Sequence, residues 1–112
     1  MEIRNYKDLE VASNPHGIDA FKLYDKEHAI IMHLLMKPGQ SLKPHKTPVD
    51  VAFYILEGNP LILVGEEKMQ VKKDDIVESP KNIVHCIYNE TDEIVRILVM
   101  KLPKPQAKTI LV

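Results

Sequence analysis

Short hydrophobic runs alternate with turn residues along most of the chain. The runs are about four to ten residues long and rich in β-branched and aromatic residues, which the pleated surface of a sheet favours. This pattern predicts strands at residues 29–36, 51–57, 61–64, 69–73, 84–89 and 94–103. Short strands at this spacing are typical of an all-β sandwich or barrel.

The residues between the runs predict turns and one short helix. Residues 5–12, NYKDLEVA, have a short and imperfect apolar face, so a helix is expected only at the N-terminal edge. Pro38 and Gly39 are typical of a type II turn, because proline fixes its φ angle and glycine accepts a positive one. Asp74 and Asn82 are expected at tight corners, where their side chains tolerate left-handed φ angles.

Length and charge predict one domain without a nucleic-acid partner. The 112 residues are enough for one core, with a barrel at about residues 29–103, strands or a short helix in 1–28, and a tail at 104–112. The tail is expected to leave the core, or to pair with another subunit. The 15 Lys and Arg residues nearly balance 16 Asp and Glu, so no broad positive field attracts nucleic acid or anionic lipid.

The N-terminus and the single cysteine predict a soluble cytoplasmic protein. The first ten residues are charged where a signal peptide needs an apolar stretch, and Cys86 alone cannot form an internal disulfide. The longest hydrophobic runs are interrupted by His33 and Arg96 and are shorter than the roughly 20 residues of a membrane helix. No membrane association is expected.

Strand alternation places two groups of side chains on defined faces. His45 and Thr47 share one face of their segment, and the next strand has one face formed by Val51, Phe53 and Ile55. If His45 points inward, the pocket that it enters is therefore largely apolar.

Alternation also predicts which polar residues avoid this pocket. Asp50 lies on the opposite face from Val51 unless a bulge intervenes, so it is expected to be solvated at a loop end. Cys86 points away from the pocket as a structural thiol. His16 and His28 belong to a charged, poorly patterned region and are expected at the surface.

Two spaced motifs resemble the two signatures of the cupin family. The first signature has a glycine, two histidines beginning after five further residues, a glutamate and a second glycine, and it is matched in spacing by Gly39, His45 and Gly58. The second has proline, glycine, histidine and asparagine, and residues 80–89, PKNIVHCIYN, supply Pro80, His85 and Asn89, with Asn82 in the place of the glycine. Two coupled signatures are more specific than either alone.

The resemblance implies a double-stranded β-helix, a jelly-roll barrel of two antiparallel sheets that is usually dimeric. It also implies a metal ion inside the barrel, held by three histidines and a glutamate. Only His45 and His85 stand at ligand positions here, while Thr47 and Val51 occupy the other two. A divalent ion (Zn, Ni, Mn or Fe) is therefore expected to bind weakly, if the site binds one. His33 of the neighbouring strand is an alternative third ligand, but comparison with typical cupins makes Met32, Leu34 and Met36 the inward residues instead.

The residues support two classes of function and leave open whether the protein is an enzyme. The first class is a small-molecule-binding barrel with an incomplete metal site, and its pocket is lined by Met32, Thr47, Val51, Phe53, Ile55 and Ile87. The alternative is a metal-dependent enzyme, dioxygenase-like or isomerase-like, in which His45 and His85 hold an ion that orients a small organic acid, phenol or sugar. The two histidines can equally be hydrogen-bonded pocket residues without a metal, and the pocket can be vestigial.

The last predicted strand indicates a homodimer. Residues 94–100, IVRILVM, have apolar side chains at both odd and even positions, so these side chains cannot all face one barrel interior. One face of this strand is therefore expected to need a partner sheet.

Overall fold

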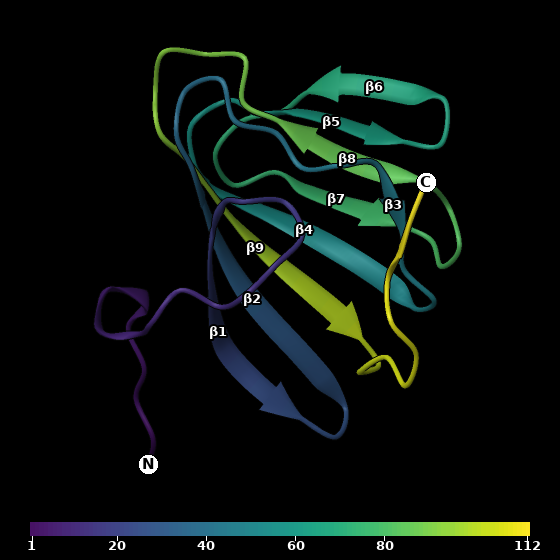
Figure 1. The fold of residues 1–112 in the computed structure, drawn as a ribbon. Coiled ribbons are helices and arrows are strands. Elements are labelled where there is room, and N and C mark those ends of the chain that lie inside the picture. Colours follow the sequence, from purple (N-terminus) through teal and green to yellow (C-terminus); the bar gives the residue numbers. More distant parts are fainter.

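The computed structural model describes residues 1–112, and its strands form two five-stranded antiparallel sheets (Figure 1). The first sheet has the order β1-β2-β9-β4-β7, and the second has the order β10-β3-β8-β5-β6. The elements are the 3-10 helix η1 (Tyr6–Asp8) and the strands β1 (Asp19–Lys26), β2 (Ala29–Met36), β3 (His45–Lys46), β4 (Asp50–Glu57), β5 (Leu61–Val64), β6 (Glu67–Gln70), β7 (Ile76–Ser79), β8 (His85–Tyr88), β9 (Val95–Leu102) and β10 (Ile110–Leu111).

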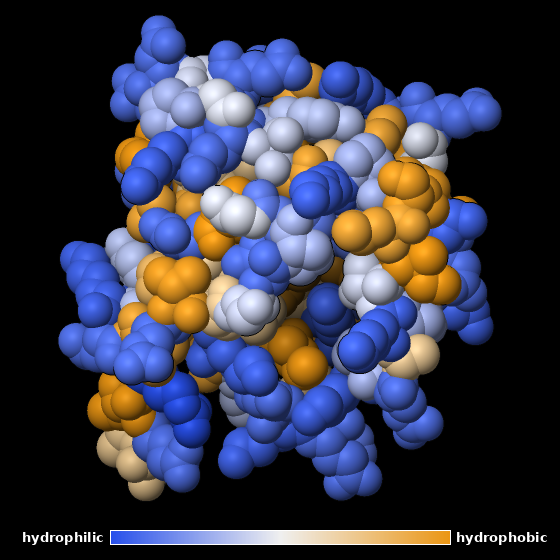
Figure 2. All heavy atoms as spheres, in the orientation of Figure 1, coloured by the Kyte–Doolittle hydropathy of each residue, from blue (hydrophilic) through white to orange (hydrophobic).

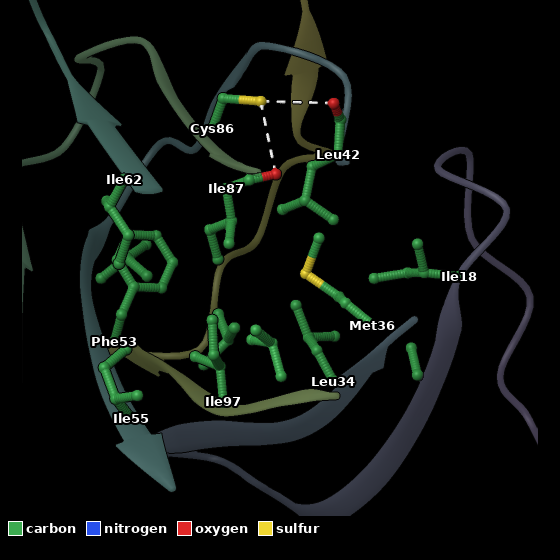
Figure 3. Close-up of a cluster of buried hydrophobic side chains, with 14 residues drawn as sticks. Ile18, Leu34, Met36, Leu42, Phe53, Ile55, Ile62, Cys86, Ile87 and Ile97 are labelled. Atoms are coloured by element: carbon green, nitrogen blue, oxygen red, sulfur yellow. Dashed lines mark hydrogen bonds between the residues drawn. The ribbon is translucent and has the colours of Figure 1, made fainter. Parts of the chain in front are cut away.

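The chain passes back and forth between the two sheets, which makes the fold a double-stranded β-helix. After β4 in the first sheet, the β5–β6 hairpin lies in the second, β7 returns to the first, β8 lies in the second and β9 closes the first. The inner faces of both sheets meet in one apolar core (Figure 3), whose fully buried members include Met36, Phe53, Ile55, Ile87 and Ile97. This core confirms the predicted all-β jelly-roll class.

The strands with strong hydrophobic patterns are where the sequence predicts them. β2, β4 and β9 agree with the predicted runs to within a residue. β4 and β9 bury alternate side chains against the core, and β2 is apolar at every position except His33. The strand predicted at residues 69–73 lies earlier in the chain, because β6 begins at Glu67, next to the hairpin turn. All of its residues are exposed, so it has no buried face to mark its bounds. β1 lies within residues 1–28, where strands or a short helix are expected without bounds, and β7 is not predicted because charged residues interrupt its pattern.

The predicted helix is a single 3-10 turn, and the predicted turns are confirmed. Asn5 caps this turn by accepting a hydrogen bond from the Lys7 backbone N–H. Gly39 has a φ angle of 84°, and the Gln40 N–H donates to the Lys37 carbonyl across the turn at 3.1 Å. Asp74 and Asn82 have left-handed φ angles of 72° and 62°.

The C-terminal residues return to the barrel instead of leaving it. β10 pairs with β3, where Leu111 is opposite His45, and the Val112 N–H donates to the Pro44 carbonyl at 3.2 Å. The tail therefore covers an edge of the second sheet within its own chain. None of the helices has the length and apolarity to cross a membrane.

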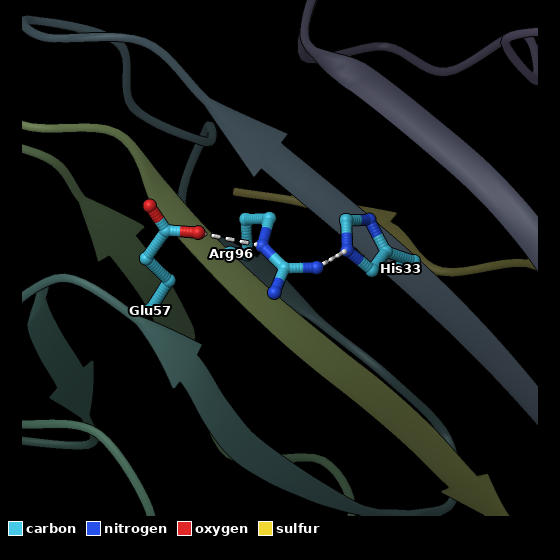
Figure 4. Close-up of polar contacts among 3 residues, drawn as sticks. All are labelled: His33, Glu57 and Arg96. Atoms are coloured by element: carbon cyan, nitrogen blue, oxygen red, sulfur yellow. Dashed lines mark hydrogen bonds and ion pairs between the residues drawn. The ribbon is translucent and has the colours of Figure 1, made fainter. Parts of the chain in front are cut away.

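His33 lies on the outer face of the first sheet, away from the core. Tyr6 stacks on its ring at 3.9 Å, and the Arg96 guanidinium donates to its Nε2 at 3.2 Å (Figure 4). Arg96 also bonds Glu57 at 2.8 Å, so it joins β2, β9 and β4 across the sheet. The same face carries half-buried apolar side chains, among them Leu98 and Met100.

Candidate functional site

His45 and His85 meet inside the barrel. They are opposite each other on the adjacent strands β3 and β8, and their Nε2 atoms are 3.0 Å apart. Both side chains are buried, and the Phe53 ring packs edge-on against His85 at 5.2 Å between centroids. Two imidazoles from segments 40 residues apart thus share one place in the core.

The neighbouring groups determine which nitrogen of each imidazole carries hydrogen. The Lys43 carbonyl can only accept, so His45 Nδ1, 2.7 Å away, is the donor. The Nε2 of a neutral His45 then accepts a hydrogen bond from His85 Nε2–H, and His85 Nδ1 accepts from the Ser79 hydroxyl at 2.7 Å. The Thr47 hydroxyl lies 3.3 Å from His85 Nε2. A directed chain of hydrogen bonds therefore runs from Ser79 to Lys43.

Burial keeps both histidines neutral, as this chain requires. Burial lowers the pKa of His85 to about 3, and repulsion from His45, Lys101 and His16 adds to the effect. Burial also lowers the pKa of His45, with a smaller contribution from Lys101, although the Lys43 carbonyl acts in the opposite direction. Both rings are uncharged at neutral pH.

A cavity of about 260 Å³ opens beside His45, between the sheets. Its apolar wall includes Ile30, Met32, Leu34, Leu42, Phe53 and Val99, and its polar lining includes His16, Lys22, His45 and Lys101. The N-terminal segment and Thr109 of the C-terminal tail form its rim. Figure 2 shows a hollow between these two segments, near the centre of the face in view, with hydrophobic atoms inside it.

The structure places only some of the predicted pocket residues at this cavity. Met32 and Phe53 line it beside His45. The remaining predicted residues lie outside its lining and fill the barrel interior as core, at most 3% exposed: Thr47, Val51, Ile55 and Ile87. Side chains of this size close the centre of a small barrel, so the open space is displaced towards the N-terminal segment. His85 is likewise behind His45 and does not line the cavity.

His16 and Lys101 are the site residues that sequence reasoning missed. His16, expected at the surface, lies 4.9 Å from His45 between ring centroids, because Asn14 bonds the Ala12 and Ile18 carbonyls and folds the segment over the opening. Lys101 lies on the inner face of β9, and its parity with Val95, Ile97 and Val99 was the available signal. Burial lowers the pKa of Lys101.

The donor atoms do not fit a tightly held divalent metal. The two Nε2 atoms are close enough to share an ion, and Ser79 and the Lys43 carbonyl could support the rings from behind. However, no group of three or more His, Cys, Asp or Glu side chains converges anywhere in the structure, and Lys101 brings positive charge close to the pair. Structural and catalytic metal sites ordinarily need at least three protein ligands.

The other polar residues have structural contacts. Asp50 is exposed and accepts a hydrogen bond from the Lys81 N–H at 3.0 Å. The Cys86 thiol is buried and donates to the Leu42 carbonyl at 3.2 Å (Figure 3). Asn89 donates to the Met36 and Glu93 carbonyls and orders the turn before β9. None of these three residues lines the cavity.

Comparison with known proteins identifies the family of this chain. A cupin domain model matches residues 32–101. An uncharacterised protein of Methanocaldococcus jannaschii is 30% identical over 86 residues, which cover 76% of this chain and 74% of that protein. The crystal structure of TT1209 from Thermus thermophilus is 28% identical, with a TM-score of 0.80 over 94% of this chain and 100% of that chain.

The fold is also shared with more distant structures. The polyketide cyclase RemF from Streptomyces resistomycificus superposes with a TM-score of 0.85 over 100% of this chain and 85% of its own, at 17% identity. An identity this low shows the common fold alone. The family model covers more than half of the chain and the sheets have the matching topology, so this protein belongs to the cupin family.

Proposed function

We propose that this protein binds a small, largely apolar organic molecule in the cavity between its sheets. The observation that supports the proposal is the cavity of about 260 Å³, with an apolar wall around Met32, Phe53 and Val99 and a few polar groups at one side. Ligand sites in proteins typically combine such a wall with a small number of orienting polar groups. The size of the cavity suits a molecule with a single ring.

Filling the cavity should abolish binding. A panel of one-ring aromatic compounds is expected to raise the thermal midpoint of the wild-type protein, because a ligand that binds only the folded state stabilises it by mass action. Met32→Trp, which places a large ring in the cavity, should lose this response. Met69 is exposed on β6, and Met69→Trp is the matched control that should keep it. An unchanged response in Met32→Trp would place the ligand elsewhere and refute the proposal.

A weak divalent-metal site at His45 and His85 is the second candidate, favoured by the 3.0 Å separation of their Nε2 atoms. With two protein ligands, an ion is expected to be lost during dialysis, so elemental analysis should find substoichiometric metal. Added Zn²⁺ or Ni²⁺ should raise the thermal midpoint of the wild type and of His28→Gln, but not of His45→Gln. A stabilisation that persists in His45→Gln would exclude this pair as the site.

A further inference from the structure

Lys101 is a cation in the cavity wall without a counter-ion. It lies opposite Ile30 of β2 and Val51 of β4, on the inner face of the first sheet, and it takes part in none of the ion pairs of the protein. Lys22 also lines the cavity, but its ammonium lies 3.3 Å from Asp25, a carboxylate that Lys104 also contacts at 2.7 Å. An unpaired charge that is partly removed from water costs free energy unless a partner compensates it.

His16 provides a second unused donor at the cavity. The Lys43 backbone N–H donates to its Nδ1 at 2.9 Å, so this nitrogen is an acceptor. Burial, and then repulsion from His45, Lys43 and Lys101, lowers the pKa of His16 to about 4, which leaves the ring neutral. The hydrogen of a neutral ring with an accepting Nδ1 is on Nε2. No group of the protein accepts it.

The cavity lacks a matching set of acceptors. No aspartate or glutamate lines it, and its hydroxyls, those of Ser13 and Thr109, can donate as well as accept. Both nitrogens of His45 are occupied by Lys43 and His85, and the Asn14 amide is occupied by the backbone of its own segment. A positively charged ligand would therefore find no carboxylate to pair with and would be repelled by Lys101.

We infer that the cavity selects a small organic anion, a carboxylate with an apolar body, which pairs with the Lys101 ammonium and the His16 Nε2–H. This inference rests on the proposed small-molecule function and names its ligand class. An ionised carboxylate only accepts hydrogen bonds, so it complements the unused donors of Lys101 and His16, and the hydroxyls of Ser13 and Thr109 can also donate to it. The apolar wall of Met32, Phe53 and Val99 requires an organic body, because an inorganic anion would leave it uncovered.

Benzoate and its neutral analogue benzamide test the charge requirement by calorimetric titration at neutral pH. Wild-type protein is expected to bind benzoate at least about tenfold more tightly than benzamide, as charge-assisted hydrogen bonds in partly buried sites allow. Lys101→Met removes the charge and leaves an unbranched side chain one atom shorter, and it should lose this preference because benzoate affinity falls more than benzamide affinity. Lys73→Met, an exposed lysine away from the cavity, is the control that should keep it.

The outcomes separate this inference from the proposed function. Equal affinity for both probes, or a preference that survives Lys101→Met, would overturn the anion inference and leave small-molecule binding intact. Binding of neither probe, together with no response to the aromatic panel, would overturn both. Lys101→Met is expected to unfold at no lower temperature than the wild type, because it removes a desolvated cation. His16→Leu gives an independent check, and it should weaken benzoate more than benzamide.

Discussion

Gly58→Ala is expected to lower the free energy of unfolding by about 2–5 kcal/mol. The φ angle of Gly58 is 84°, where an L-residue costs about 1–2 kcal/mol. A Cβ atom there would also lie 2.6 Å from the Ile94 carbonyl oxygen and 2.8 Å from Val95 Cγ2. Overpacking of this kind typically adds about 1–3 kcal/mol. Urea denaturation followed by circular dichroism measures the loss.

Gly39→Ala is the matched control for this change. Gly39 has the same φ angle of 84°, but a Cβ atom there would meet nothing within 4 Å. In its alanine variant, the free energy of unfolding is expected to fall only by the cost of the positive φ angle, about 1–2 kcal/mol. The difference between the two variants therefore measures the contact with Ile94 and Val95 at the start of β9. Equal losses would show that the close approach of Gly58 to this strand contributes nothing.

Acidification is expected to destabilise the protein through His33, by up to about 3 kcal/mol between pH 6.5 and 4. Burial, and then repulsion from Arg96, lowers the pKa of His33 from 6.5 to about 4. The unfolded chain therefore binds the proton more readily than the folded protein in this range. The stabilisation is complete above pH 6.5 and disappears as the pH falls towards 4, at about 1.4 kcal/mol for each unit of pKa shift.

The surroundings of His33 give the physical reason. Tyr6 of η1 stacks on the ring, Phe21 of β1 meets it edge-on at 6.0 Å, and Arg96 of β9 donates to its Nε2. Glu57 balances Arg96 but does not bond the imidazole. A protonated ring would lose its acceptor and would face a guanidinium.

His33→Gln separates this effect from those of the other histidines. Glutamine supplies a carbonyl acceptor for Arg96 and does not titrate, so the variant should lose less stability than the wild type between pH 6.5 and 4. His28 is fully exposed, and His28→Gln should follow the wild-type curve. Urea midpoints measured across this range provide the comparison. Parallel curves for His33→Gln and the wild type would contradict the assignment.

Much of the fold is predictable because it follows from local alternation. β4 and β9 bury alternate residues, β2 is an almost continuous apolar run, and Gly39 requires a conformation that few other residues accept. β3 and β10 are only two residues long, so neither contains enough residues for a periodic signal. Their pairing depends on the rest of the barrel being in place.

The site was predictable only in part, because part of it depends on tertiary packing and leaves no local pattern in the sequence. The convergence of His45 and His85 follows from two spaced motifs, each on a strand of the second sheet. The position of the cavity depends on how completely Ile55 and Ile87 fill the centre, which no linear pattern records. His16 reaches the site through a loop held by Asn14, and such tertiary placement leaves no periodic signal in the sequence.

The hydrogen bond between Ser79 and His85 links strands of opposite sheets, β7 and β8. Separation of the two sheets at that position would break a hydrogen bond between buried polar groups, so this bond holds the sheets together there. The segment from Ser13 to His16 lines the cavity without belonging to either sheet. Exchange of a bound ligand with solvent is therefore expected to depend on displacement of residues 13–16, while the two sheets stay together at the Ser79–His85 hydrogen bond.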